Sequence, residues 1–185
     1  MGLVRLYFKG VSELASTENV GLLTLVDEKR ERQLSVICDS ATVYQFGLRT
    51  GKAEVVPRLA PEVLWQVIAR NVDLRFQVVI NDLVDGEYKT LLYMPDILQA
   101  IPVRASDGVL IAEIAGLPIY IEERLLRRQG MPHKDDQVSV SVPVNVLTTE
   151  MLQKALDRAV EKEDYEKASQ IRDELLRRKK KGPST

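Results

Sequence analysis

Arg104, Ser106 and Asp107 are the side chains best suited to chemistry, because they stand together just before a strongly apolar run, Val109 to Ala115. That run is apolar on almost every side, which predicts a buried helix that begins at Ser106 as its N-cap. Backbone N–H groups without partners point outward at the start of a helix, and polar ligands gather there. The same residues can also be ordinary caps at the centre of a hydrophobic core. A binding site and a purely structural role therefore both stay open.

The segments that must position these residues predict an α+β fold, with a mainly antiparallel β-sheet packed on a few helices. Asp85-Gly86 can supply the positive φ angles of a tight hairpin turn, and Gly116 suits the left-handed residue that ends the central helix. Alternation of apolar and polar residues predicts a set of strands. They span Leu3–Gly10, Gly21–Val26, Arg32–Ile37, Leu74–Val84, Glu87–Met94 and the central strand Ile119–Ile121. Further helices are expected after Asp39 and after Pro61, the latter with an apolar stripe at helical spacing.

The composition is that of an ordinary globular protein, with 45% hydrophobic and 29% charged residues and a formal net charge of −1. That charge does not indicate nucleic-acid binding by the chain as a whole. No apolar run approaches the length that spans a bilayer, and the N-terminus lacks the layout of a signal peptide. A single cysteine, Cys38, excludes an intrachain disulfide and favours a reducing cytoplasm. We expect Cys38 to be a small buried residue and His133, the single histidine, to lie at the surface.

Two motifs resemble a known family. The motif Arg104-x-Ser106-Asp107 opens an apolar helix, and Pro118-Ile119-Tyr120 and Glu122-Glu123 follow it. This series is similar to the bifunctional nuclease domain of bacteria and plants. The segment Leu83-Val84-Asp85-Gly86-Glu87-Tyr88 resembles that domain's hairpin signature. The resemblance covers residues 4–126 and implies hydrolysis of DNA and RNA phosphodiester bonds with a divalent metal, Mg²⁺ or Mn²⁺.

Under this resemblance the catalytic candidates are Asp107, Arg104, Glu122 and Glu123. Phosphodiester hydrolysis needs carboxylates to hold metal, a group that activates water, and positive charge for the transition state. Asp107 is the candidate metal ligand, and Arg104 supplies positive charge. A capping role for Asp107 remains the alternative.

Arg124, Arg127 and Arg128 are the candidate nucleic-acid contacts, since offsets of three and four place them on one side of a helix. The chain also departs from the family pattern at two places. The expected glutamate and histidine are replaced where the sequence reads Cys38–Thr42 and Ala60–Glu62. These replacements count against catalysis.

The C-terminal segment, residues 149–181, predicts a helical hairpin with one apolar stripe on each helix. The stripes are Leu152, Ala155, Leu156 and Ala159, then Tyr165, Ala168, Ile171 and Leu175. Glu163–Ala168 and Ile171–Leu175 resemble the UVR motif of the excision-repair proteins UvrB and UvrC, a hairpin that pairs with a second copy of itself. The resemblance implies a protein partner bound through residues 149–181. The basic run Arg177–Lys181 can also attract phosphates, without sequence specificity.

The predicted organisation is a bifunctional-nuclease-like domain over residues 1–130, a linker over 131–148 and the hairpin over 149–181. Gln137–Val146 has strand periodicity interrupted by Pro143, so it is either an extended linker or an edge strand. Two functions follow from these parts. The first is a metal-dependent nuclease with an interaction tail. The alternative is a non-catalytic adaptor whose core forms a homo-oligomer and whose tail recruits a partner, with no membrane contact.

Overall fold

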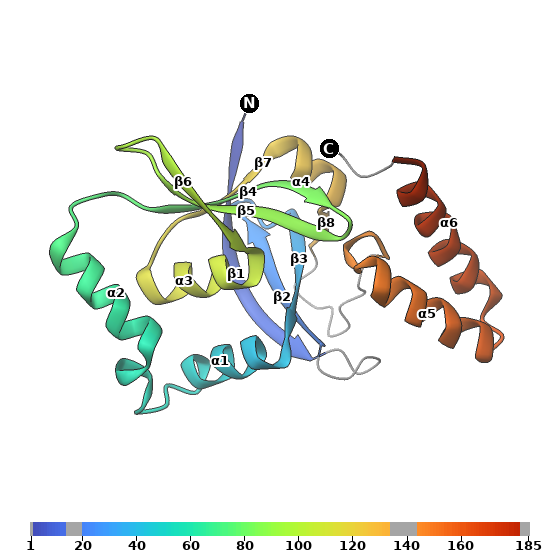
Figure 1. The fold of residues 1–185 in the computed structure, drawn as a ribbon, viewed down its shortest axis with the longest axis horizontal. Coiled ribbons are helices and arrows are strands. Elements are labelled where there is room, and N and C mark those ends of the chain that lie inside the picture. Colours follow the sequence, from blue (N-terminus) through green and yellow to red (C-terminus); the bar gives the residue numbers. More distant parts are fainter. Residues whose placement is uncertain (1, 14–19, 134–143, 182–185) are drawn as a thin grey trace. The chain divides into compact units, whose positions relative to one another are not determined.

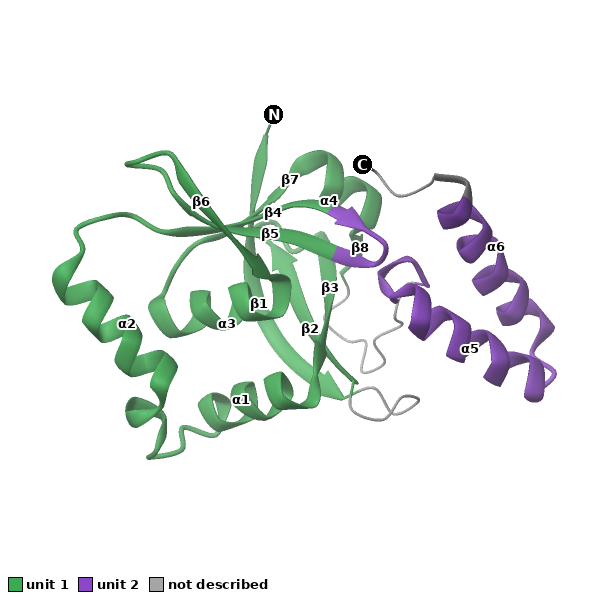
Figure 2. Cartoon of the chain, viewed as in Figure 1, with its two compact units in different colours: residues 1–82, 88–136 green, residues 83–87, 137–185 purple. Residues whose placement is uncertain are grey.

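The computed structural model describes residues 2–13, 20–133 and 144–181, which fall into two compact units (Figure 2). Unit 1 comprises residues 1–82 and 88–136, and unit 2 comprises residues 83–87 and 137–185. Most of the predicted edge strand, residues 137–143, lies outside the described residues, and Val144–Val146 forms a short 3-10 helix. The predicted domain boundaries after residues 130 and 148 stay a prediction.

An eight-stranded sheet organises the described residues of the core, in the order β6-β5-β4-β7-β1-β2-β3-β8 (Figure 1). Its strands are β1 (Leu3–Glu13), β2 (Val20–Asp27), β3 (Arg32–Asp39), β4 (Gln77–Val84), β5 (Glu87–Met94), β6 (Gln99–Arg104), β7 (Ile119–Glu122) and β8 (Met131–Pro132). Its helices are α1 (Ser40–Thr50), α2 (Ala60–Asn71), α3 (Ala105–Ala115) and α4 (Glu123–Gln129). The β4–β7 pair is parallel, whereas β1–β2, β1–β7, β2–β3, β3–β8 and β5–β6 are antiparallel. The predicted α+β class is confirmed.

Helices α1 and α3 pack on the sheet through alternate residues of the strands. Phe46 of α1 stacks on Phe8 of β1 with ring centroids 4.7 Å apart. On α3, a Cβ added at Gly108 would come within 3.2 Å of Thr90 and Val78, so the absence of a side chain lets this helix approach the strands closely. Val109 beside it has no exposed surface. Burying a valine of this kind stabilises the fold by roughly 1.5–3 kcal/mol.

The N-cap of the central helix α3 lies two residues earlier than the sequence suggested. Arg104 occupies the N-cap position with extended backbone angles and no capping bond from its side chain, while Ser106 is buried inside the helix. The prediction of Ser106 as the N-cap is therefore wrong. The reason is that β6 ends at Arg104 and turns directly into α3, with no residue left over for a separate cap. The C-terminal end is as predicted, since Gly116 adopts the left-handed conformation at φ 65°.

The hairpin turn and the central strand also follow the sequence-based expectation. Asp85 and Gly86 both have positive φ, at 52° and 84°, as a primed two-residue turn requires. Strand β7 lies inside the sheet between β4 and β1, and Ile121 in it has no exposed surface.

Helix α2 differs from α1 and α3 because none of its residues is buried. Its apolar stripe faces outward, with exposed fractions of 44% for Val63, 62% for Leu64, 55% for Val67 and 37% for Ile68. Trp65, on another flank, packs edge-on against Phe76 at 5.6 Å.

Unit 2 contains the helical hairpin of α5 (Thr149–Glu161) and α6 (Tyr165–Lys181). Its small core consists of Leu152, Ala159, Ile171 and Leu175. Asp164 caps α6 as expected for an aspartate before a helix, accepting a hydrogen bond of 3.1 Å from the Lys167 N–H. Tyr165 departs from the predicted stripe, because 69% of its surface is exposed.

Candidate nucleic-acid site

Arg104 contacts two carboxylates, one three residues away in the sequence and one from a distant part of the chain. Its Nε and Nη2 donate to the two oxygens of Asp107 at 2.6 and 2.9 Å, and its Nη1 donates to Asp39 Oδ2 at 3.2 Å. Asp39 and Arg104 are 65 residues apart, and their strands β3 and β6 lie near opposite ends of the sheet order. The fold therefore brings Asp39 to a pair, Arg104 and Asp107, that is already close in the sequence.

Two strand-to-helix junctions position this cluster. Asp39 ends β3 and caps α1, where its Oδ1 accepts a hydrogen bond of 2.8 Å from the Thr42 N–H. Arg104 ends β6 and stands at the N-cap of α3, and Asp107 lies in the first turn of that helix. Both carboxylates thus lie at helix N-termini, where the helix dipole favours negative charge.

The cluster is open to solvent, and its hydrogen bonds shift the pKa values of Asp39 and Arg104. The side chains are 66% exposed for Arg104, 47% for Asp39 and 35% for Asp107. Hydrogen bonds from Thr42, and secondarily the Arg104 guanidinium, hold the pKa of Asp39 below its usual value. The hydrogen bonds to Asp107 and then to Asp39 raise the pKa of Arg104. Asp39 and Arg104 are therefore both charged at neutral pH.

The described residues do not form a ready metal cage. Divalent Mg²⁺ takes oxygen ligands with near-octahedral geometry. Both oxygens of Asp107 are engaged by Arg104, and both oxygens of Asp39 are engaged by Thr42 and Arg104. Among the residues that the structure describes, no three His, Cys, Asp or Glu side chains converge as a metal site would need. The role of Asp107 as a metal ligand stays a prediction.

The remaining candidate residues lie on β7 and α4. Glu122 ends β7, and Glu123 begins α4, where it pairs with Arg127. Within the described ranges, no hydrogen bond or ion pair joins either glutamate to Arg104 or Asp107. The predicted catalytic residues therefore divide into an Arg104–Asp107 group and a separate glutamate pair.

The three arginines of α4 present an exposed positive surface. Arg124, Arg127 and Arg128 are all solvent-exposed, and Arg128 lies 3.8 Å from Asp82. Arg32 donates to the carbonyls of Arg127 and Gly130 near the C-terminal end of this helix, where carbonyls have no helical partner. This arrangement satisfies the end of α4 while leaving its arginine side chains facing water.

Two known families match parts of the chain. The bifunctional nuclease domain matches residues 23–134, which is more than half of the chain. The chain belongs to the bifunctional nuclease domain family. The UvrB/UvrC motif matches residues 149–181, so both predicted resemblances are confirmed. No curated protein matches the chain. Across the described residues, no helix is both long and apolar enough to cross a membrane.

Asp39 contacts Arg104, whereas the sequence predicts it only as a helix cap. It stands in the segment where the family pattern places a glutamate. The signal was available, because a carboxylate at the end of a strand can face a second junction. Which junction it faces depends on the folded sheet, and that could not be derived locally.

Cys38 and His133 are two further residues of the bifunctional nuclease domain whose side-chain types can exchange protons. Burial, and then the neighbouring Asp39 charge, raise the pKa of the Cys38 thiol to about 12. Cys38 is therefore a neutral buried thiol, as predicted. His133 is half-buried, and its Nδ1 lies 2.9 Å from Gln33 Oε1, so it is less exposed than predicted. Neither group is part of the Arg104 cluster.

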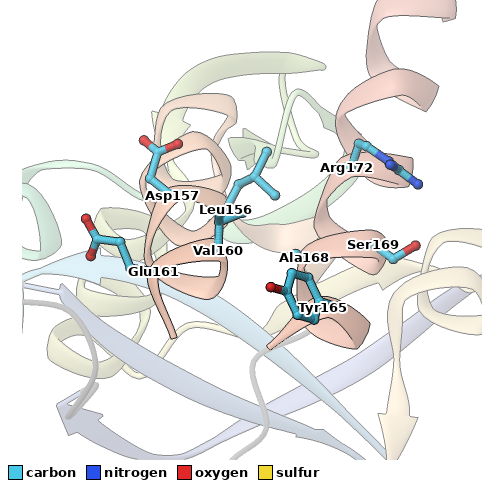
Figure 3. A pocket seen from close by; sticks show the side chains of 8 residues that line it. All are labelled: Leu156, Asp157, Val160, Glu161, Tyr165, Ala168, Ser169 and Arg172. Carbon is cyan, nitrogen blue, oxygen red and sulfur yellow. The ribbon is translucent and has the colours of Figure 1, made fainter. Parts of the chain in front are cut away.

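In the UvrB/UvrC-type hairpin, a groove of about 780 Å³ lies between α5 and α6 (Figure 3). Leu156 and Val160 of α5 and Ala168 of α6 contribute its apolar surface. Acidic side chains of α5 and Arg172 of α6 stand along its rims, and Tyr165 lies at its end.

Proposed function

We propose that the bifunctional nuclease domain of this chain hydrolyses phosphodiester bonds of DNA or RNA at the cluster of Arg104, Asp39 and Asp107. The convergence of two carboxylates on one exposed guanidinium carries this proposal. A guanidinium matches the geometry of a phosphate, and the adjacent carboxylates can orient water. Arg124, Arg127 and Arg128 would hold neighbouring phosphates. A divalent ion, Mg²⁺ or Mn²⁺, stays part of the proposal.

Cleavage of labelled single- and double-stranded DNA and RNA tests this function. The purified chain is incubated with Mg²⁺, with Mn²⁺ or with chelator, beside Asp107→Asn and the control Asp73→Asn, which changes an exposed carboxylate elsewhere. We expect Asp107→Asn to lose most cleavage at an unchanged melting temperature, and Asp73→Asn to cleave like the parent chain. Equal cleavage by all three proteins would assign Asp107 a capping role only.

A second candidate function is that of an adaptor, which the open groove of the hairpin favours. Val160 is 54% exposed and Tyr165 is 69% exposed, so the hairpin leaves apolar surface unburied. A second hairpin of the same kind would bring its Arg172 against the acidic rim of the first. The partner would therefore be another UvrB/UvrC-type hairpin, from a second copy or from another protein.

Sedimentation measurements can test the adaptor function. Val160→Glu places a charge in the groove, and Gln170→Glu places the same charge on an exposed position outside the residues lining it. We expect only Val160→Glu, and truncation after residue 143, to abolish association through the tail. An identical assembly state in all these proteins would rule out this role for the hairpin.

The homo-oligomeric core of the adaptor hypothesis is supported by α2. Four aliphatic side chains on one stripe are 37–62% exposed, and a stripe of this kind is typical of an interface. The stripe, Val63, Leu64, Val67 and Ile68, contains no charged residue, so two copies can pair about a two-fold axis without repulsion. We expect Leu64→Asp to dissociate the core, whereas Gln66→Asp on the same helix should not. A monomeric parent chain at all concentrations would contradict this interface.

A further inference from the structure

The sheet of unit 1 carries an arginine between two tyrosines on its face away from α1. Leu6 and Phe8 of β1 point inward, Phe8 onto Phe46 of α1, so the alternate residues Arg5 and Tyr7 point to the opposite face. Arg5 pairs across the strands with Tyr120 of β7. Tyr7 is then the diagonal neighbour of Tyr120 on the adjacent strand, and diagonal positions of this kind are roughly 7–8 Å apart.

The guanidinium of Arg5 lies against both rings. Its Cζ is 5.3 Å from the centroid of the Tyr7 ring and 5.7 Å from that of the Tyr120 ring, which are cation–π distances. Within the described structure, the buried Nε of Arg5 has no hydrogen-bond partner. Tyr7 keeps 44% of its surface exposed. The patch therefore offers an exposed aromatic ring next to a half-buried cation.

We propose that this patch of Arg5, Tyr7 and Tyr120 binds single-stranded nucleic acid, with bases stacked on the tyrosines and a phosphate near Arg5. The proposal rests on the proposed function only in that its ligand is a nucleic acid. Every base has a π face that an exposed tyrosine can cover, and that face is available in a single strand but hidden in a duplex. A phosphate beside Tyr7 would also be attracted by the positive charge of Arg5, whereas an apolar protein surface offers no opposite charge.

Neighbouring charges indicate a path for the strand. Arg124 of α4 follows Tyr120 by four positions, so their Cα atoms are at most about 14 Å apart. Glu122 lies between them and pairs with Leu3 on the Arg5 side of the sheet. Its charge disfavours a phosphate at that point, so Glu122→Gln should tighten binding.

Fluorescence anisotropy with a labelled single-stranded oligothymidylate or oligouridylate and a matched duplex tests the patch. Chelator is present, so that cleavage does not contribute. Tyr7→Ala should weaken single-strand binding about 5- to 150-fold, the range for loss of one stacked base. Tyr7→Phe should stay within about twofold of the parent chain, because stacking needs the ring and not the hydroxyl. Tyr44→Ala on α1, where the tyrosine is 65% exposed, is the matched control and should bind normally.

Salt dependence separates a phosphate contact from a structural effect. Arg5→Gln should reduce the slope of log affinity against log salt by about 0.7, as expected for one phosphate on a single strand. Unchanged affinity in both Tyr7→Ala and Arg5→Gln would overturn the inference. So would equal losses in Tyr7→Ala and Tyr44→Ala, or an effect of Tyr7→Ala on self-association alone, which would assign the patch to a protein partner.

The two proposals can fail separately. If the parent chain never cleaves but loses binding in Tyr7→Ala, the nuclease function is wrong and the binding patch stands. If the chain cleaves, and both cleavage and binding persist in Tyr7→Ala and Arg5→Gln, the patch is wrong and the nuclease function stands.

Discussion

Substitution of Asp39 by asparagine and by alanine separates its two contacts. Asparagine keeps an oxygen that can accept from the Thr42 N–H, whereas alanine removes the cap, which costs about 1 kcal/mol. Both remove the charge that faces Arg104. That ion pair is exposed on both sides, so its loss costs at most about 1 kcal/mol. We therefore expect Asp39→Ala to melt about 2–4 °C below Asp39→Asn, since 1 kcal/mol corresponds to that shift in a chain of this size.

The pH dependence of stability gives a second readout for Asp39. Its pKa is lowered in the folded chain, so its charge stabilises the fold above the unfolded pKa of about 3.9. That stabilisation is lost as the pH falls through the folded pKa. The melting-temperature difference between the parent chain and Asp39→Asn should stay constant from pH 7 to 5 and shrink below about pH 4.

Cleavage by the same proteins decides whether Asp39 belongs to the site. If it does, Asp39→Asn and Asp39→Ala should lose cleavage to the same degree, although only alanine loses the cap. Phosphodiester cleavage by Asp39→Asn at the parent rate would refute this reasoning and reduce Asp39 to a helix cap. A melting difference below about 1 °C between the two variants would refute the capping argument instead.

Three further predictions concern buried polar groups. Arg49 and Glu62 form an ion pair with side chains only 13% and 12% exposed. Arg49→Met should therefore lower the free energy of unfolding, measured with denaturant, by about 3–5 kcal/mol. The double variant that also carries Glu62→Met should recover most of that stability. Cys38, with its pKa raised to about 12, should resist alkylation at pH 8 until denaturant is added; rapid labelling of the native chain would contradict its burial. Arg178 donates to the Asn145 carbonyl at 2.9 Å, so Arg178→Met should increase hydrogen exchange in α6, and unchanged exchange would show that this contact does not stabilise the hairpin.

Features set by a few consecutive residues were predictable from sequence. The turn at Asp85 and Gly86, the end of α3 at Gly116 and the cap of α6 at Asp164 each depend on one residue type in one backbone conformation. Ser106 was misplaced for the same local reason, because the sequence does not reveal that β6 runs into α3 without a spacer. Strand periodicity likewise predicts which residues form strands, but it does not predict which strands pair with each other.

Features set by the whole sheet were not predictable. The contact between Asp39 and Arg104 depends on the order of eight strands and on two helices beneath them. The exposure of α2 was not predictable either. An apolar stripe such as Leu64 and Val67 predicts that this face of the helix packs against another surface, but it does not identify that surface. The Asp39–Arg104 contact and the exposure of α2 therefore both required the folded chain.

The charges around Arg104 determine how hydrolysis at this site should respond to pH. A phosphate must replace one carboxylate, and Asp39, with a single contact of 3.2 Å, is easier to replace than Asp107 with two shorter ones. Asp39 would still be held by Thr42, but its lowered pKa makes it a weak base at neutral pH.

Cys38 is a neutral thiol and His133 lies outside the cluster, so neither is placed to act as a base at this site. The cleavage rate at a fixed substrate concentration should therefore rise about tenfold per pH unit between pH 6 and 8, because hydroxide becomes the limiting reactant. A plateau that begins near pH 6.5 would contradict this argument, since it would require a general base that titrates there. The variant His133→Asn then tests whether His133 is that base. A plateau that persists in this variant excludes His133, and a plateau that disappears assigns the base to it.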